Sequence, residues 1–317
     1  MENKVYDVII IGAGAAGLTA AIYTRRKLLS TLVISVDIGG QTLLTEHIEN
    51  YPGYTGLSGP KLMQIMYEQA LNFGAEFIMG RVEGVEKVGD NFKVILSNGE
   101  NYEGKTLILA FGKVPRKLGI PGEDKFVGRG VHTCATCDAP LMKNKIVAVI
   151  GGGNSALEAT ELLSKFANKV YLIHRRDQFR ADEITVEKVK QCKNVEFILN
   201  TIPIEIKGND KVQSLVVENV NTKERKEISL DSVFVEIGYE TKVDFVKHLV
   251  KVNENNEIIT NDFAETSCPG IFAAGDITNK PYKQTITAAG EGAIAGLSAY
   301  NYLMKKSGKP SVKVDWS

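Results

Sequence analysis

Short, nearly unbroken apolar runs recur along the chain, and each of them ends at glycine or at a polar turn. The clearest runs are residues 5–11, 106–110, 146–150, 233–237 and 271–274. Strands that are buried on both faces of a parallel sheet have this pattern, whereas half-exposed strands alternate between apolar and polar residues. The chain is therefore predicted to be an α/β protein built on parallel sheets.

Helical and alternating segments fill the intervals between these runs. Helices are expected at residues 18–27, 61–73 and 284–303, and the last of them is rich in small residues. Residues 76–100 alternate like strands around Asn98-Gly99, a dipeptide that favours a hairpin turn. Antiparallel strands are therefore expected beside the parallel ones.

The length of 317 residues exceeds one ordinary core and fits about two domains. We expect residues 1–115 and 246–317 to build one domain, into which residues 116–245 are inserted as a second. Residues 115–121 contain two prolines and are expected to be a linker rather than an element. The chain should cross back near residues 240–249.

Composition excludes several classes of partner. Lys plus Arg (38) balances Asp plus Glu (38), so no overall field favours nucleic acid or an acidic membrane surface. Four cysteines form no disulfide scaffold and favour a reducing compartment. The N-terminus leads straight into a strand without a signal-peptide layout, and no run of about 18 apolar residues is present. We expect a soluble, cytoplasmic protein.

A glycine-rich turn follows the first apolar run and opens the first helix. It reads Gly12-Ala13-Gly14-Ala15-Ala16-Gly17, the dinucleotide fingerprint in its context of strand, turn and helix. Gly12 makes the turn, Gly14 lets a pyrophosphate approach the backbone, and Gly17 allows close packing of helix on strand. The helix N-terminus then offers free N–H groups to phosphates. The alternative is a tight turn without a ligand.

The residue that should bind the ribose hydroxyls is unusual in this first unit. The second strand, residues 31–36, carries Ser35 where an acidic residue is typical, with Asp37 two positions later. The ribose contact is therefore weak or comes from Asp37. Gly39-Gly40-Gln41 follows, and it is either a turn that passes close to a bulky ligand or a plain loop.

A second glycine turn, residues 151–156, repeats the first unit with Ala156 in the place of the third glycine. His174 follows Gly151 by the same 23 positions that separate Ser35 from Gly12, and Arg175, Arg176 and Arg180 come after it. A guanidinium accepts the 2′-phosphate that a carboxylate would repel, so this unit is predicted to prefer NADPH. The alternative is a solvated basic surface. Two such units predict two Rossmann-like dinucleotide-binding domains.

A pair of cysteines, Cys134 and Cys137, stands just before the second unit in the sequence Cys134-Ala135-Thr136-Cys137-Asp138. This spacing occurs in zinc half-sites and in redox dithiols. A structural zinc site needs four ligands, and Cys192 and Cys268 are isolated, so His132 would leave the shell open. We interpret the pair as a redox dithiol; zinc and an inert pair are the alternatives.

Electron transfer between nicotinamide and dithiol requires a flavin, because nicotinamide delivers hydride and a dithiol accepts electrons through a thiolate. We therefore assign flavin adenine dinucleotide (FAD) to the first unit and NADPH to the second. Asp276, after the apolar run 271–274, is expected to hold a ribityl hydroxyl; a turn-capping aspartate is the alternative. Four residues are expected to be bystanders: Cys192, Cys268, His47 and His248.

These motifs together resemble the low-molecular-weight thioredoxin reductases over the whole chain, in the family's order. The resemblance implies a homodimer with FAD in the first domain, NADPH in the second, and a large rotation between domains, with thioredoxin or a similar small disulfide protein as partner. It implies Cys134, Cys137 and Asp138 as catalytic residues. The implied FAD residues are Gly12, Ala13, Gly14, Ala15, Ala16, Ser35, Gly40, Gln41, Asn50, Val82, Ala110, Gly112, Gly275, Asp276, Lys283, Gln284 and Thr285. The implied NADPH residues are Gly153, Asn154, Ser155, His174, Arg175, Arg176, Arg180 and Ile237, and no metal is implied.

The chain departs from the family pattern at several positions. Phe111 replaces the threonine of Ala-Thr-Gly and so removes a hydroxyl, and Lys283 replaces an arginine. Residues 139–141, after the redox motif, differ from the better-known bacterial form, which bears on how a partner docks. None of these changes removes a reacting group.

The expected mechanism runs from NADPH through flavin to the Cys134–Cys137 disulfide. A helix start lowers a cysteine pKa and favours the attacking thiolate, and Asp138 is the expected proton donor. The resemblance places Cys137 nearer the flavin. Two rival hypotheses remain: reduction of a glutaredoxin-like or peroxidase-linked partner, and a non-enzymatic protein that only binds nucleotide.

Overall fold

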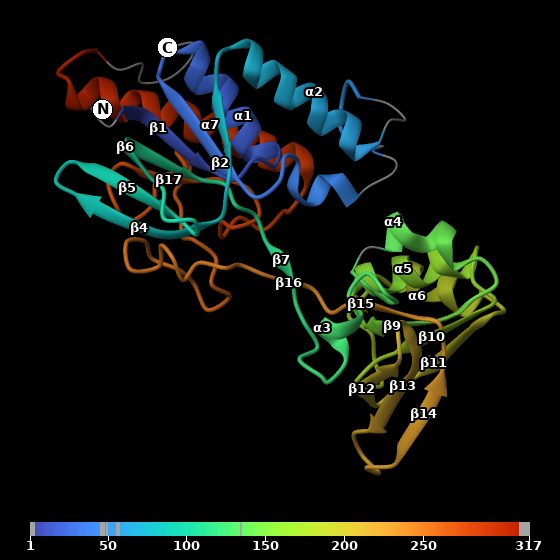
Figure 1. Ribbon diagram of the computed structural model, residues 1–317. Coiled ribbons are helices and arrows are strands. Elements are labelled where there is room, and N and C mark those ends of the chain that lie inside the picture. Colours follow the sequence, from blue (N-terminus) through green and yellow to red (C-terminus); the bar gives the residue numbers. More distant parts are fainter. Residues whose placement is uncertain (1–3, 45–47, 49, 55–57, 134, 311–317) are drawn as a thin grey trace. The chain divides into compact units, whose positions relative to one another are not determined.

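The computed structural model describes residues 4–44, 48, 50–54, 58–133 and 135–310. The chain forms two compact units. Unit 1 contains residues up to Val114 and from Thr241 onward, and unit 2 spans residues 115–240. The chain passes between the units through two short strands, β7 (Val114–Pro115) and β16 (Tyr239–Glu240), which pair with each other (Figure 1).

Unit 1 is built around a seven-stranded sheet in the order β3-β2-β1-β6-β5-β4, with β17 paired to β6. Strands β1, β2, β3 and β17 run parallel to their neighbours, while β4, β5 and β6 form an antiparallel meander. The strand bounds are β1 (Val5–Ile11), β2 (Thr31–Ser35), β3 (Glu76–Met79), β4 (Val82–Val88), β5 (Asn91–Leu96), β6 (Asn101–Leu109) and β17 (Ile271–Ala273). The hairpin expected at Asn98-Gly99 is confirmed as the β5–β6 turn, where the Leu96 N–H donates to the Glu100 carbonyl at 2.9 Å.

The parallel strands of unit 1 are mostly apolar because both faces of the sheet are covered. On one face, Val8, Ile10 and Val33 pack against three helices, which lie together above the sheet in Figure 1. On the other face, Ile9 and Ile11 pack with a second core cluster that includes residues 243–258. The helices are α1 (Ala15–Arg26), α2 (Gly59–Asn72) and α7 (Thr285–Lys306).

Unit 2 holds a five-stranded parallel sheet in the order β11-β10-β9-β15-β8 and a three-stranded antiparallel sheet, β12-β13-β14. The strands are β8 (Val131–His132), β9 (Ile146–Gly151), β10 (Lys169–Ile173), β11 (Val195–Ile198), β12 (Thr201–Gly208), β13 (Val212–Asn219), β14 (Arg225–Ser229) and β15 (Ser232–Glu236). The helices are α3 (Glu123–Phe126), α4 (Ala135–Asp138), α5 (Asn154–Ser164) and α6 (Glu183–Lys190). The predicted α/β class with parallel sheets is confirmed.

Several elements differ from their expected bounds. The segment at Gly39-Gly40-Gln41 is not an open turn, because a 3-10 helix, η1 (Gly40–Leu44), begins at Gly40. A second 3-10 helix, η2 (Ala139–Met142), follows the redox motif. Strand β17 has three residues, fewer than the apolar run suggested, since Ala274 already leaves the ladder. Helix α7 extends three residues past the expected end, to Lys306.

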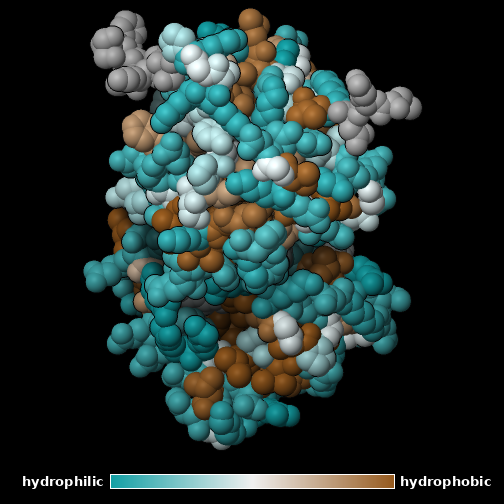
Figure 2. Space-filling model, turned by 90° about the vertical axis from the view of Figure 1, so that its left-hand side faces the viewer, coloured by the Kyte–Doolittle hydropathy of each residue, from teal (hydrophilic) through white to brown (hydrophobic). Residues whose placement is uncertain are grey.

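The surface is mixed in character. On the face drawn in Figure 2, hydrophilic residues make up most of the surface and hydrophobic residues gather in separate patches. Among the helices that the structure describes, none combines the length and apolar character needed to cross a bilayer.

Candidate functional site

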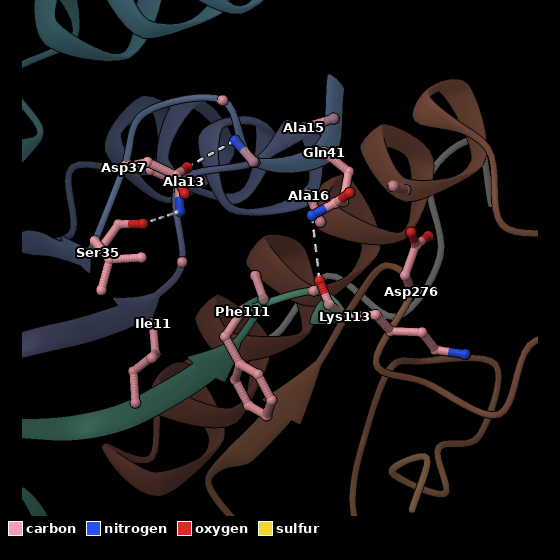
Figure 3. A pocket seen from close by; sticks show the side chains of 18 of the residues that line it. Ile11, Ala13, Ala15, Ala16, Ser35, Asp37, Gln41, Phe111, Lys113 and Asp276 are labelled. Carbon is pink, nitrogen blue, oxygen red and sulfur yellow. Dashed lines mark hydrogen bonds between the residues drawn. The ribbon is translucent and has the colours of Figure 1, made fainter. Parts of the chain in front are cut away.

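A pocket of about 430 Å³ opens in unit 1 at the carboxyl ends of β1, β2 and β6. Ligands bind at this edge in open parallel sheets, because strand ends and helix starts meet there. Figure 3 shows the pocket with its lining side chains. The lining includes these residues expected to contact FAD: Gly12, Ala13, Gly14, Ala15, Ala16, Ser35, Gly40, Gln41, Val82, Ala110, Gly112, Asp276, Lys283, Gln284 and Thr285.

The first glycine turn has the geometry that its sequence predicts. Gly12 has φ +107°, and a Cβ there would lie 2.3 Å from the Ala110 carbonyl oxygen, so only glycine fits. A Cβ at Gly17 would lie 1.9 Å from the Gly12 carbonyl oxygen, which explains the close contact of helix and strand. At Gly14, by contrast, the nearest atom lies 3.8 Å from such a Cβ, an ordinary van der Waals contact, so the turn is less crowded there. Helix α1 also starts without a side-chain cap.

Ser35 and Asp37 are already engaged with the backbone of the pocket. The Ala13 N–H donates to the Ser35 hydroxyl at 3.1 Å, and the Gly40 N–H donates to the Asp37 carboxylate at 2.8 Å (Figure 3). Ser35 therefore holds the glycine turn, while Asp37 lines the pocket with one carboxylate oxygen bonded to the Gly40 N–H. This arrangement favours Asp37 over Ser35 as the ribose contact, the alternative that the sequence left open.

Asp276 is a half-buried carboxylate in the pocket wall. Burial raises its pKa, and the nearby Lys283 and Lys113 counter this effect only in part. Within the described residues we find no hydrogen-bond donor to this carboxylate. A carboxylate held in a pocket without a donor from its own chain can accept a hydroxyl from a ligand.

Lys113 and Lys283 converge on one glutamate near Asp276. Lys113 lies 2.9 Å and Lys283 3.4 Å from the Glu257 carboxylate, and Lys283 also donates to the Thr278 carbonyl. Burial acts to raise the pKa of Glu257, but hydrogen bonds from Lys113 and Asn253 outweigh it and lower the pKa. Both ammonium groups are thereby fixed beside the pocket.

The start of α7 closes the pocket. Gln284 and Thr287 form a capping box, and the Gln284 side chain also accepts from Asn50 at 3.0 Å. Asn50 and Gly275 are both described but do not line the pocket. The Gly275 N–H donates instead to Glu291 at 2.8 Å. Asn50 thus bonds to Gln284, and Gly275 directly precedes Asp276, and both of these neighbours line the pocket.

Sequence reasoning missed part of the lining. Phe111 and Phe245 both line the pocket and meet edge to face, with ring centroids 4.9 Å apart. Arg81 and Lys113 line it too, and the Gln41 amide donates to the Lys113 carbonyl at 3.4 Å. The sequence marked Phe111 only as a departure from the family pattern, and the signal for the other two is position alone: Lys113 follows β6, and Arg81 precedes β4.

The second glycine turn, in unit 2, is packed differently. A Cβ at Gly151 would lie 2.2 Å from the Glu236 carbonyl oxygen, and one at Gly152 would lie 2.2 Å from the His174 ring. His174 is buried, bonds through Nε2 to the Gln178 carbonyl at 3.0 Å, and stacks on Phe179. Burial lowers its pKa. His174, which the sequence placed in the cofactor site, thus buttresses the glycine turn as a neutral ring.

The arginines after His174 are exposed: Arg175, Arg176 and Arg180. In the described part of the chain none of the three forms an ion pair. The Arg180 N–H donates to the Gly152 carbonyl at 2.7 Å, which ties this cluster to the glycine turn.

Helix α5 begins directly after the second glycine turn. It has no side-chain cap, and Ser155 is exposed in its first turn. Asn154 is less available, because its side chain exchanges two hydrogen bonds with Asp182. Ile237, just past β15, packs on the edge of a unit 2 core.

The redox motif lies at the start of α4 in unit 2. Cys134 lies outside the described residues, and so does the side chain of Cys137, so their bonding state is not part of the structure described. His132 Nδ1 lies 2.6 Å from the Asp138 carboxylate, and the Ala135 N–H donates to Glu236. Burial raises the pKa of Glu236 to about 7, and the neighbouring charge of Glu158 adds to this.

The remaining cysteines and histidines lie away from these groups. Cys192 and Cys268 are free thiols, and burial raises the pKa of Cys268. His248 bonds to the Val85 carbonyl at 3.0 Å, while His47 lies outside the described residues. Within the described ranges no group of three or more His, Cys, Asp or Glu is arranged to hold a metal ion.

Comparison with known proteins agrees with this geometry. The family model for pyridine nucleotide-disulphide oxidoreductases matches residues 6–292. The chain belongs to this family. Within it, a thioredoxin reductase of Bacillus subtilis is 43% identical over 95% of this chain and 96% of its own. A bifunctional thioredoxin reductase/thioredoxin of Mycobacterium leprae is 40% identical over 97% of this chain and 68% of its own.

Solved structures give the same assignment. The crystal structure of Lactococcus lactis thioredoxin reductase matches with a TM-score of 0.85 and 42% identity, over 95% of this chain and 99% of that one. The resemblance to low-molecular-weight thioredoxin reductases is therefore confirmed, as is the two-domain dinucleotide-binding fold. Thioredoxin reductases in this oxidoreductase family use FAD and NADPH.

The residues present fit these two groups. In unit 1, the uncrowded backbone at Gly14, the uncapped start of α1 and the Asp276 carboxylate, which has no hydrogen-bond donor among the described residues, suit a pyrophosphate and a polyol chain. In unit 2, an uncapped helix start lies close to three arginines that form no ion pair in the described residues. That donor set suits a dinucleotide with an additional phosphate.

Proposed function

We propose that this oxidoreductase takes electrons from NADPH and reduces the disulfide of thioredoxin through FAD and the Cys134–Cys137 pair. One observation carries the proposal: each unit has its own glycine turn leading into an uncapped helix, and the second turn shares a sheet with the strand that leads into the cysteine motif. A flavin and a nicotinamide site in one chain, with a dithiol, form a complete electron route.

For FAD, we propose the pocket of unit 1. The backbone of residues 12–16 would hold the pyrophosphate, Asp37 the ribose, and Asp276 a ribityl hydroxyl. Lys283, Gln284 and Thr285 precede or open α7, whose N-terminus favours negative charge on the ligand. Asn50 and Gly275 would contribute by positioning Gln284 and Asp276, and Val82, Ala110 and Gly112 by shaping the wall.

For NADPH, we propose the edge of the unit 2 sheet around Gly153, Asn154, Ser155 and Ile237. Arg175, Arg176 and Arg180 would bind the 2′-phosphate with charge-assisted hydrogen bonds. His174 would act indirectly, since its ring fills the space behind Gly152.

When bound, FAD would supply the conversion of a hydride from NADPH into an electron pair that a disulfide can accept. The chain's own residues would then carry out the thiol exchange and the proton transfers. Cys134 and Cys137 open as a pair, the backbone N–H groups at the start of α4 favour the thiolate, and Asp138 donates a proton. Cys137, nearer the flavin by resemblance, would accept electrons, and Cys134 would attack the partner.

Thioredoxin is the proposed partner because the relatives carry that name. In the Mycobacterium leprae relative a reductase and a thioredoxin share one name and one chain. We also propose a homodimer, since helices α1, α2 and α7 expose the large apolar side chains of Tyr23, Ile65 and Ile294. A cytoplasmic location follows from a dithiol that must be re-reduced by NADPH.

The deciding experiment is an anaerobic titration of the purified protein with NADPH and with NADH, followed by thioredoxin. We expect flavin absorbance to bleach with NADPH and to return when thioredoxin is added, with thiols released. Cys134→Ser and Cys137→Ser should abolish thioredoxin reduction and leave bleaching intact, while Cys192→Ser serves as the matched control.

Three results would change the proposal. A colourless protein would remove the flavin step, and bleaching without thiol release would favour a nucleotide-binding protein that is not a disulfide reductase. Faster turnover with a glutaredoxin-like or peroxidase-linked domain than with thioredoxin would change the partner. Analytical ultracentrifugation tests the homodimer.

A further inference from the structure

A histidine and an aspartate bracket the redox motif and touch each other. His132 stands two positions before Cys134, and Asp138 follows Cys137 directly. The His132 Nδ1 and an Asp138 carboxylate oxygen are 2.6 Å apart, within hydrogen-bonding distance. Their side chains are 12% and 30% exposed, so water screens the pair only in part. The pair therefore closes a short loop of chain around the motif.

The imidazole is fixed from behind by the sheet of unit 2. His132 ends β8, which runs parallel to β15, and its register partner is Phe234. The two rings stack with centroids 4.8 Å apart and an interplanar angle of 18°. Phe234 is fully buried. Because the His132 ring is held by a core residue rather than by α4, its Nδ1 stays directed toward Asp138. The hydrogen bond to Nδ1 therefore fixes the direction of the carboxylate.

We propose that His132 is a positioning residue for Asp138, and that the two groups share the proton which is exchanged with the dithiol. This inference rests on the proposed disulfide reductase function and adds a residue to it. Asp138 alone is a short carboxylate on a four-residue helix, and a hydrogen-bonded imidazole both orients it and supplies a second proton site.

The electron pair that originates from NADPH breaks the Cys134–Cys137 bond and leaves two thiolates, one of which takes the proton of the pair. The other thiolate attacks the partner's disulfide, forming a mixed disulfide and expelling a partner thiolate. The pair then removes the proton from the remaining thiol. The resulting thiolate attacks the enzyme sulfur of the mixed disulfide, restores the Cys134–Cys137 bond and expels the second partner thiolate. The two partner thiolates take up two protons, one carried in with the hydride and one from solvent, and the pair ends with the proton that it began with.

Other ionisable groups face α4 from the neighbouring elements. Glu236 at the end of β15 accepts the Ala135 N–H, and Glu158 on α5 acts on Glu236 through its charge. Because burial raises the pKa of Glu236 to about 7, its own ionisation falls within the pH range over which the dithiol is tested. Variants of His132 therefore have to be compared over a pH range rather than at one pH.

The test uses two substitutions at His132. His132→Phe keeps a ring to stack on Phe234 and removes the nitrogens, while His132→Asn keeps a donor close to Asp138 but cannot carry a shared proton. His248→Phe, a histidine bonded to a backbone carbonyl in unit 1, is the matched control. Two rates are measured from pH 6 to 9 in each holoenzyme: flavin bleaching by NADPH, and thioredoxin reduction. Circular dichroism confirms folding.

We expect His132→Phe to slow thioredoxin reduction about tenfold, the order found when a residue that orients a reacting group is lost. Bleaching should stay within about twofold of the wild-type rate. His132→Asn should recover part of the rate and lose one limb of the pH profile, and His248→Phe should match the wild type.

Unchanged thioredoxin reduction and an unchanged pH profile in His132→Phe would overturn the inference alone. Equal losses in both rates would also overturn it, because they would indicate a structural role. A wild-type enzyme that bleaches but reduces no disulfide would instead refute the proposed function.

Discussion

Glu236→Gln should stabilise the protein at alkaline pH and leave it nearly unchanged in acid. The Glu236 carboxyl is half-buried behind α4, beside the charge of Glu158, and burial raises its pKa from 4.5 to about 7. Between these two values the folded protein binds more protons than the unfolded chain, so stability falls as the pH rises and stays low above about 7. Glutamine keeps an acceptor for the Ala135 N–H and carries no charge.

The size of the effect follows from the linkage relation. One pKa unit corresponds to about 1.4 kcal/mol, so the ionised carboxylate costs the folded state about 3 kcal/mol in all. About 2 kcal/mol of this loss in folding stability develops between pH 5.5 and 8.5. At roughly 4 °C per kcal/mol for a unit of this size, Glu236→Gln should gain about 8 °C in melting temperature over the wild type across that range.

The assay is thermal unfolding followed by circular dichroism at several pH values, with Glu224→Gln as control because Glu224 is an exposed glutamate of the same unit. A gap between Glu236→Gln and wild type that stays constant from pH 5.5 to 8.5 would refute the reasoning. So would a gap that grows toward acid, since it would mean that the folded state prefers the ionised carboxylate.

Three more predictions concern the cofactor sites. Arg176→Ala should raise the Km for NADPH about tenfold or more and leave that for NADH unchanged, since one charge-assisted bond to the 2′-phosphate is lost; equal changes with both coenzymes would argue against a phosphate site. Gly12→Ala, whose Cβ would lie 2.3 Å from a carbonyl oxygen, should yield protein without flavin colour, whereas Gly84→Ala, with 3.7 Å to its nearest neighbour, should remain yellow. Asp276→Asn should weaken flavin binding about tenfold in a fluorescence release assay, while Asp262→Asn, exposed and paired with Lys280, should not; similar retention in both variants would remove Asp276 from the site.

Much of the fold was predictable because the signals are local. A strand buried on both faces is apolar at nearly every position, and residues 5–11 and 146–150 have this pattern. The glycine turns were equally readable, since Gly12 and Gly17 each leave no room for a Cβ. The motif itself is local, although the atom that excludes a Cβ at Gly12 belongs to Ala110, far along the chain.

Residues that meet across the fold were harder to predict. Ser35 occupies the position of a ribose-binding acid, yet its hydroxyl is taken by the Ala13 N–H, and Asp37 is engaged by Gly40. His174 stands in the expected phosphate cluster, but its ring is buried against Gly152. Nothing in the spacing distinguishes a side chain that faces a ligand from one that supports the loop behind it.

The sequence by itself determined the two nucleotide units, the cysteine pair and the basic cluster, because each is a short motif whose chemistry depends on neighbouring residues. Only the tertiary structure decided which ionisable groups lie close to one another. It placed Glu236 behind α4, brought Lys113 and Lys283 to one glutamate, and stacked His132 on Phe234 so that its ring faces Asp138. The physical reason is that burial and electrostatics depend on distance in space, and strand pairing brings together residues that are a hundred positions apart in the chain.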